Sequence, residues 1–277
     1  MTDRAREFRD LHCRGRFLIL PNAWDAGSAR LIQECGARAI ATTSSGVAWS
    51  RGYPDGDALP PRVLATVVAE IARVIHVPLS VDIEGGYSCE PARVGEVVAL
   101  VAEAGGVGIN IEDGSGPVDL LCAKIAAARA AAQRCGVDIF INARTDVYLK
   151  ALVPAPGAAQ ETIARARRYR DAGCDGLFVP RLTAREDIER IAEEVELPLN
   201  LMLVPGLPPL AELRALGVRR VSAGSALAQA AYGRAQRAAR QLLEAERFDG
   251  LFEDGAAYAD MNAMMTPATG RCACGRD

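Results

Sequence analysis

Histidine is scarce in this chain of 277 residues, and its cysteines are scattered. The chain has two histidines, His12 and His76, and none of its eight cysteines form a Cys-x-x-Cys pair. Structural zinc sites are built from such pairs with further cysteine or histidine ligands, so the sequence argues against one. Isolated thiols are typical of reduced, half-buried side chains in a cytosolic protein. Only Cys272 and Cys274, in a glycine-rich tail, are close enough to raise the question of a soft-metal site.

Long apolar runs and basic stripes are missing as well. No apolar run reaches the roughly 20 residues of a membrane span, and the first 16 residues are too polar for a signal peptide. The formal net charge of −3 and the absence of a basic patch argue against a nucleic-acid surface. No Gly-x-Gly-x-x-Gly follows the first apolar run, which makes a dinucleotide-binding sheet the weaker interpretation. We therefore expect a cytoplasmic protein without nucleic-acid or membrane partners.

What the chain does contain is a repeated strand and helix pattern. Apolar β-branched runs alternate with Ala/Arg/Glu-rich stretches, and several stretches end in a glycine directly before the next run, as αβ loops require. Eight strands at this chain length favour a closed (β/α)8 TIM barrel over an open doubly wound sheet. The predicted strands are 17–21, 39–44, 78–84, 106–113, 138–146, 175–180, 198–203 and 219–224.

Helices are predicted to flank this barrel at both ends. Residues 2–14 indicate an extra N-terminal helix, and residues 225–246 the last barrel helix. Residues 248–265 show helical apolar spacing, which suits an arm packed on its own barrel or on a neighbouring subunit. We expect a single domain over residues 1–277, in which residues 248–277 form a C-terminal arm and tail.

Polar side chains gather at the carboxyl ends of three consecutive predicted strands, where barrel enzymes carry their chemistry. Side chains two positions apart share a strand face, so seven of them are predicted to point into the barrel mouth, with Asp113 opposite. The seven are Asp82, Glu84, Asn110, Glu112, Asn142, Arg144 and Asp146.

The carboxylates of this group indicate a hard divalent cation, Mg²⁺ with Mn²⁺ as the alternative, because magnesium takes oxygen ligands and keeps several waters. One direct carboxylate and two acting through waters would suffice. Arg144 then suits a substrate carboxylate or phosphonate, which it can grip with two parallel hydrogen bonds. The alternative is a buried salt-bridge layer in which Arg144 pairs with Glu112 and Asp82 without any ligand. Clustered charges of this kind favour a functional site.

Six phrases in chain order resemble the isocitrate lyase and phosphoenolpyruvate mutase superfamily, over about residues 17–265. The closest similarity is to its short-lid members, described as phosphonomutase-like or methylisocitrate-lyase-like. The resemblance implies a carbon–carbon lyase that forms homodimers or homotetramers, in which a late helix crosses to a neighbour. The phrases are PNAWDAGSARL, ATTSSGVAWSRGYPDGD, SVDIEGGY, GINIEDG, INARTDVYL and GVRRVSAGS.

The resemblance also implies roles for the matching residues. Magnesium would be bound directly by Asp82, with Glu84 and Glu112 reaching it through water. Arg144 would hold the far end of a small carboxylate or phosphonate, and Asp55 would lie near the reacting group, so that the catalytic set is Asp55, Arg144 and Glu112. The implied substrate-binding residues are Trp24, Thr43, Ser44, Ser45, Gly46, Val47, Arg144 and Asn200. From the residues alone, the Ser/Gly-rich segment 43–47 is either an anion-binding turn or merely a flexible loop.

One departure from the superfamily concerns the lid. Its lyases carry a Lys-(Lys/Arg)-Cys-Gly-His run after the fourth strand, whose cysteine is the acid, whereas this chain reads GSGPVDLLCAKIAAAR there. Cys122 falls in the next predicted helix and is expected to be a core cysteine. The Asn-bearing lid of the phosphoenolpyruvate mutases is missing too. Water must then be excluded by another segment or a neighbouring subunit, or the reaction must tolerate water.

These features predict a magnesium-dependent lyase. It would cleave a C–C bond of a small 2-oxo or 2-hydroxy di- or tricarboxylic acid (oxaloacetate-, alkylmalate- or methylisocitrate-like) through an enolate, which a metal stabilises electrostatically. The alternative is P–C bond chemistry of the phosphonomutase or phosphonopyruvate hydrolase type. A phosphate-binding barrel using Ser222, Gly224 and Ser225 at the start of the last helix, or a non-catalytic binding protein, would belong to another class.

Overall fold

The computed structural model describes residues 3–13, 16–253 and 255–266. The chain divides into two compact units, residues 1–229 and 230–277, with the boundary inside helix α10 (Ala226–Glu244). In the second unit, η1 (Asp249–Leu251) and α11 (Tyr258–Met265) supply the helical structure that was predicted for 248–265. The pair Cys272 and Cys274 lies outside the described residues.

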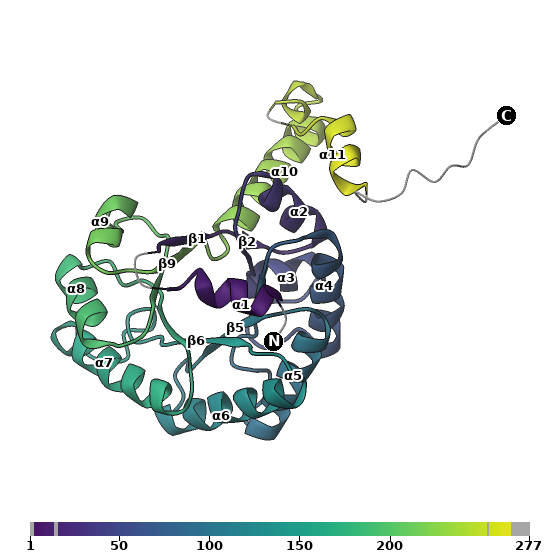
Figure 1. Ribbon diagram of the computed structural model, residues 1–277. Helices are drawn as coiled ribbons and strands as arrows, with labels where there is room; N and C mark the ends of the chain where they lie inside the picture. The colour runs from purple at the N-terminus through teal and green to yellow at the C-terminus, as the bar shows by residue number, and fades with distance from the viewer. Residues whose placement is uncertain (1–2, 14–15, 254, 267–277) are drawn as a thin grey trace. The chain divides into compact units, whose positions relative to one another are not determined.

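Parallel strands form a nearly closed barrel in the first unit (Figure 1). Within the described residues there are nine of them, because the first predicted strand is divided around Pro21, which has no backbone N–H to donate. The first piece bonds to the last strand and the second piece to the third, so the divided strand completes the order β1-β9-β8-β7-β6-β5-β4-β3-β2. The strands are β1 (Leu18–Leu20), β2 (Asn22–Ala23), β3 (Ile40–Thr42), β4 (Leu79–Asp82), β5 (Gly108–Glu112), β6 (Phe140–Arg144), β7 (Gly176–Val179), β8 (Leu199–Met202) and β9 (Arg220–Ser222).

Helices surround the strands, which confirms the predicted TIM-type barrel (Figure 1). Strands covered by helices are buried on both faces, which explains why their sequences are nearly continuous apolar runs. Val81, Ile109 and Ile141, from three neighbouring strands, are fully buried in one apolar cluster with helix residues. The helices are α2 (Ala26–Glu34), α3 (Ser44–Ser50), α4 (Pro61–Val74), α5 (Pro91–Glu103), α6 (Val118–Arg134), α7 (Ala155–Asp171), α8 (Arg185–Glu194) and α9 (Leu210–Ala215).

The extra N-terminal helix is present as α1 (Asp3–Asp10), shorter than the predicted 2–14. It lies at the amino-terminal ends of the strands, where Phe8 is fully buried and meets Phe140 edge to face with 5.5 Å between ring centroids. A Cβ on Gly108 would lie only 2.6 Å from Phe8 Cε1, so the glycine makes room for this ring. Arg9 fixes the helix through an ion pair with Asp138 at 2.6 Å.

At the opposite end of the barrel, the connections that follow the strands differ in length. Only residues 113–117 join β5 to α6, which confirms that the chain has no long lid at this point. The connections 51–60 and 145–154, which follow α3 and β6, are longer. No helix of the described residues combines the length and the hydropathy needed to cross a membrane.

Candidate active site

A cavity of about 240 Å³ lies at the carboxyl ends of the strands. Its lining also includes Ser222, Gly224 and Ser225, which the sequence suggested as a separate phosphate site. The two predicted sites therefore share one cavity. The residues that line it from the implied catalytic, metal and substrate sets are Thr43, Ser44, Ser45, Asp55, Asp82 and Arg144.

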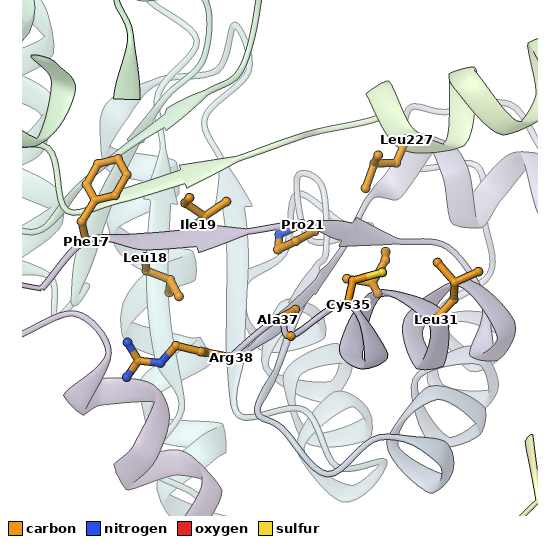
Figure 2. A pocket seen from close by; sticks show the side chains of 11 residues that line it. Phe17, Leu18, Ile19, Pro21, Leu31, Cys35, Ala37, Arg38 and Leu227 are labelled. Atoms are coloured by element: carbon orange, nitrogen blue, oxygen red, sulfur yellow. The ribbon is translucent and has the colours of Figure 1, made fainter. Parts of the chain in front are cut away.

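A larger pocket, of about 530 Å³, lies on the outer side of β1 (Figure 2). Its lining is mainly apolar and includes Phe17, Ile19, Leu31 and Leu227. Reaction sites are marked by converging polar groups more than by volume. We therefore place the candidate active site in the smaller, polar cavity.

Asp82 is the last residue of β4 and enters the cavity from there. Its backbone N–H donates to Thr42 Oγ1 at 2.8 Å, and its Oδ1 accepts from the Glu84 backbone N–H at 3.1 Å. Burial raises the pKa of Asp82, while Arg144 lowers it. The strand alternation predicted for Asp82 and Glu84 is wrong, because Glu84 has a φ of 52°, outside the range of strands. A turn after β4 brings the two acids together instead.

Glu84 is buried behind Asp82 and holds the loop that carries Asp55. Its Oε2 accepts hydrogen bonds from the backbone N–H groups of Gly56, at 2.8 Å, and Asp57. Its Oε1 is buried and has no hydrogen-bond partner within the described chain. Burial raises the pKa of Glu84, and the charges of Asp55, Asp57 and Asp82 raise it further. One oxygen thus anchors the loop, and the carboxylate also interacts with the buried phenol of Tyr87.

Arg144 ends β6 and is held by two carboxylates. Its Nε donates to Asp146 Oδ1 at 2.7 Å and its Nη2 to Asp146 Oδ2 at 3.2 Å, while Nη1 pairs with Glu112. The side chain of Asp146 is fully buried, so this carboxylate fixes the guanidinium plane. Burial raises the pKa of Glu112 to about 8 although Arg144 lowers it. Part of the predicted salt-bridge layer is therefore present, since Arg144 pairs with Glu112.

The segment 43–47 is neither a turn nor a flexible loop, because it forms the first turn of α3 with Thr43 as its N-cap. Thr43 Oγ1 lies 3.2 Å from Ser45 Oγ, and both residues line the cavity together with Ser44. Gly46 and Val47 do not line it. A Cβ on Gly46 would lie 2.7 Å from Thr43 Cγ2, and Val47 is fully buried in the apolar core.

Three other residues named from the sequence lie away from the cavity lining. Trp24 packs against the apolar core before α2. Asn200 is fully buried on β8, with its side-chain amide 3.4 Å from Ser222 Oγ. Cys122 lies on α6 with its Sγ 3.6 Å from the backbone oxygen of Arg168, and burial raises its pKa. Nothing in this placement gives Cys122 access to a substrate in the cavity.

Asp113 faces away from the cavity, as strand alternation predicted. Its carboxylate accepts hydrogen bonds from Thr145 Oγ1, the Asp146 backbone N–H, Arg165 Nη1 and Tyr169 Oη, at 2.6–2.9 Å. Arg165 and Tyr169 belong to α7. Asp113 therefore joins the ends of β5 and β6 to this helix.

Two polar residues were not predicted from the sequence, Asn22 in the cavity lining and Arg220 beneath it. Asn22 lines it and joins strands on both sides, because its Nδ2 donates to the Thr42 carbonyl and its Oδ1 accepts from the Ala223 N–H, both at 2.8 Å. Arg220 lies below the cavity and is 1% exposed, with its Nη2 3.2 Å from Asn110 Oδ1. Burial lowers the pKa of Arg220 to about 9. Arg220 begins β9 directly after Arg219, so the sequence shows two adjacent arginines and does not mark which one faces the barrel interior.

The donor set fits Mg²⁺ held mainly through water. No group of three Asp, Glu, His or Cys side chains in the described residues is arranged to chelate an ion directly. Magnesium usually takes one or two carboxylates and keeps several waters, so it does not need such a cage. The clustered acids Asp55, Asp82 and Glu84 raise one another's cost of ionisation, and a cation would offset this negative charge. Asp82 would hold the ion directly, with Glu84 and Glu112 around its waters.

Comparison with known proteins shows the family of the chain. The family model described as phosphoenolpyruvate phosphomutase matches residues 8–243. An uncharacterised protein of Mycobacterium tuberculosis is 38% identical over 258 residues, 93% of this chain and 95% of the relative. A Paraburkholderia xenovorans protein named oxaloacetate decarboxylase is 30% identical over 238 residues, 81% of this chain and 76% of the relative.

A solved structure has the same fold. The crystal structure of a Burkholderia cenocepacia protein, provisionally named a phosphonomutase, superposes with a TM-score of 0.82 at 41% identity, covering 87% of this chain and all of the other. The family match, the barrel and the acidic cavity agree with one another. The chain therefore belongs to the phosphoenolpyruvate phosphomutase family, and it is an enzyme of the isocitrate lyase and phosphoenolpyruvate mutase superfamily.

Proposed function

We propose that this enzyme is a magnesium-dependent lyase that cleaves a C–C bond of a small 2-oxo or 2-hydroxy di- or tricarboxylic acid through an enolate. The observation that carries the proposal is that a carboxylate and a guanidinium line the same cavity of about 240 Å³. The Asp82 carboxylate would bind a cation, and the guanidinium of Arg144, which Asp146 holds in position, would bind a carboxylate of the substrate. The volume is below the roughly 300 Å³ at which drug-sized pockets begin, which suits a small acid.

Different residues of the cavity would bind different groups of the substrate. Arg144, oriented by Asp146, grips the far carboxylate of the acid with parallel hydrogen bonds. Ser44 and Ser45, at the start of α3, offer their hydroxyl groups to the second carboxylate. When bound, magnesium would stabilise the negative oxygen that develops beside the breaking bond.

Asp55 is the group best placed to move a proton. It lines the cavity from the loop that Glu84 holds by the N–H groups of Gly56 and Asp57. With a 2-hydroxy acid, Asp55 takes the hydroxyl proton, the O–H electrons form the new carbonyl, and the C2–C3 electrons pass to the departing enolate. The short connection 113–117 brings no acid over the cavity, so a proton from solvent quenches that enolate.

Two relatives support the choice of C–C chemistry by their names. One is the oxaloacetate decarboxylase of Paraburkholderia xenovorans, and the other is a Corynebacterium glutamicum protein named probable 2-methylisocitrate lyase 2, at 28% identity. The structural neighbour provisionally named a phosphonomutase keeps P–C chemistry as the second candidate.

The test is a panel of 2-oxo and 2-hydroxy acids incubated with the purified protein and Mg²⁺. We expect release of pyruvate or glyoxylate from at least one acid, with loss of the activity in chelator and in Asp82→Asn. Phosphorus NMR of an incubation with phosphonopyruvate separates the second candidate. Turnover of phosphonopyruvate alone would replace the C–C proposal, and no turnover of any acid would refute it.

We also infer that the protein forms a homo-oligomer. Outward-facing strand residues such as Val221 and Leu201 are fully buried, but Ile19 on β1 is 47% exposed in the outer pocket (Figure 2). Leu31 and Leu227, beside it, are 37% and 40% exposed. An apolar strand face in a barrel needs a cover, and a second copy of the chain would supply one. Light scattering should give a dimer or tetramer that Ile19→Asp weakens, and a monomeric wild-type protein would refute the idea.

A further inference from the structure

Arg220 crosses the barrel interior beneath the cavity. It belongs to β9, is 1% exposed, and donates through Nη2 to Asn110 Oδ1 on β5 at 3.2 Å. Its Nε and Nη1 make no hydrogen bond within the described part of the chain. A buried guanidinium with so few partners is costly, and barrel interiors are usually filled by branched apolar side chains. Packing alone does not explain an arginine here.

The contact with Arg220 settles which way the Asn110 amide points. A guanidinium only donates hydrogen bonds, so the atom of Asn110 that faces it is the oxygen. Asn142 Nδ2 donates to the same oxygen at 2.9 Å. With Oδ1 held by two donors, the amide nitrogen of Asn110 is turned the other way.

The amide nitrogen of Asn110 is available to a ligand. Asn110 lines the cavity, and its register partner on β4 is Asp82. No described group accepts a hydrogen bond from its Nδ2, and this nitrogen is not among the fully enclosed unpaired atoms. Asn110 Nδ2 is thus a neutral N–H donor at the cavity, next to Asp82, the acid that would hold the metal.

We propose that Arg220 is a positioning residue that fixes Asn110, so that Asn110 Nδ2 donates a hydrogen bond to an anionic oxygen of the substrate. The inference rests on the proposed function, because the ligand it needs is a small dicarboxylate. Arg144 provides a charged donor from β6, and Asn110 provides a neutral donor from β5. Together they select an acid with two oxygen-bearing groups a short distance apart.

Asn110→Asp is the sharpest test, with oxalate as the probe in calorimetry of the full chain with Mg²⁺. The new carboxylate keeps the shape and still accepts from Arg220 and Asn142, but it presents an oxygen to the ligand. We expect oxalate affinity to fall about tenfold or more, as for a lost hydrogen bond to a charged group. The melting temperature should be unchanged or higher, because the buried guanidinium gains a charged partner. A raised melting temperature with unchanged oxalate affinity would indicate a purely structural layer and overturn the proposal.

A double-mutant cycle tests the part played by Arg220. Arg220→Met removes the donor to Asn110, and its effect on oxalate affinity should be largely lost when Asn110→Ala is already present. Arg220→Lys, which restores a donor, should recover part of the affinity. Additive losses would overturn the positioning role. If Arg220→Met does not fold, the shorter and uncharged Arg220→Gln replaces it in the cycle.

The wild-type protein separates the two proposals. Binding of oxalate by the wild type, with all the variants unaffected, would overturn this inference alone. No binding of oxalate by the wild type would overturn this inference, whereas the panel of acids decides the proposed function separately.

Discussion

Acid should destabilise the barrel through His12, which lies buried near the amino-terminal ends of the strands. Its ring stacks on Phe140 with 4.1 Å between centroids, and its Nδ1 donates to the Phe8 backbone oxygen at 2.8 Å. Its Nε2 is buried without a partner in the described chain, so a second proton would have nothing to bond to. Burial lowers the pKa of His12 from 6.5 to about 3, and the nearby charges of Arg220 and Arg9 lower it as well.

The sign and size follow from proton linkage. Below pH 6.5 the unfolded chain takes up a proton at His12, whereas the folded chain does so only near pH 3, so falling pH favours unfolding. Each pKa unit corresponds to about 1.4 kcal/mol. The loss in free energy of unfolding from this one residue is therefore about 2 kcal/mol at pH 5 and approaches roughly 5 kcal/mol below pH 3.

The assay is urea unfolding of wild-type and His12→Phe proteins at pH 7.5 and pH 5. The variant loses the bond to Phe8 at both pH values, but it lacks the titrating imidazole. Its stability relative to wild type should therefore improve by about 2 kcal/mol at pH 5, or about 0.7 M in urea midpoint for a slope near 3 kcal/mol per M. The exposed His76, changed to Phe, is the matched control. An equal difference between wild type and His12→Phe at both pH values would refute the reasoning.

Three further substitutions test the site and its frame. Asp146→Asn removes the charge that orients Arg144, and should raise KM for the substrate about tenfold while far-UV circular dichroism stays the same. An unchanged KM would mean that Glu112 alone orients the guanidinium. Asp113→Asn weakens a buried carboxylate with four donors and should lower the free energy of unfolding by about 3–5 kcal/mol in chemical denaturation. Cys122→Ser should keep kcat/KM within about twofold, because Cys122 does not line the cavity, and a loss of a hundredfold or more would restore it as the acid.

The barrel could be predicted from the sequence because its strands are buried on both faces and carry continuous apolar runs. Strand ends were less predictable. β4 stops at Asp82, two residues before the predicted end, because Glu84 adopts a positive φ in the turn. The division of the first strand at Pro21 follows from a missing N–H, a signal that the sequence contains.

The cavity was predictable in part, for physical reasons that differ from residue to residue. Asp82 and Arg144 end strands, where the barrel itself directs side chains to the mouth. Arg220 was missed because it adjoins Arg219, and a shift of one residue in register exchanges the inward and outward side chains. The helix from Ser44 was missed because seven residues are too few for local propensity, and packing of Val47 stabilises it instead. The hold of Glu84 on the loop at Gly56 is a contact between distant segments that no local pattern encodes.

Helix α1 has a consequence for how the barrel keeps its shape. Eight repeated units supply the wall, but the space that Gly108 leaves at the centre is filled by the Phe8 ring, from a segment that precedes the first repeat. The βα repeats alone therefore do not fill the barrel interior. A chain without its first dozen residues would retain every βα repeat. The amino-terminal end of the barrel interior would then be unfilled, and Phe140 would be exposed to water. Helix α1 therefore completes the packing at the amino-terminal end of the barrel, opposite the end that carries the polar cavity.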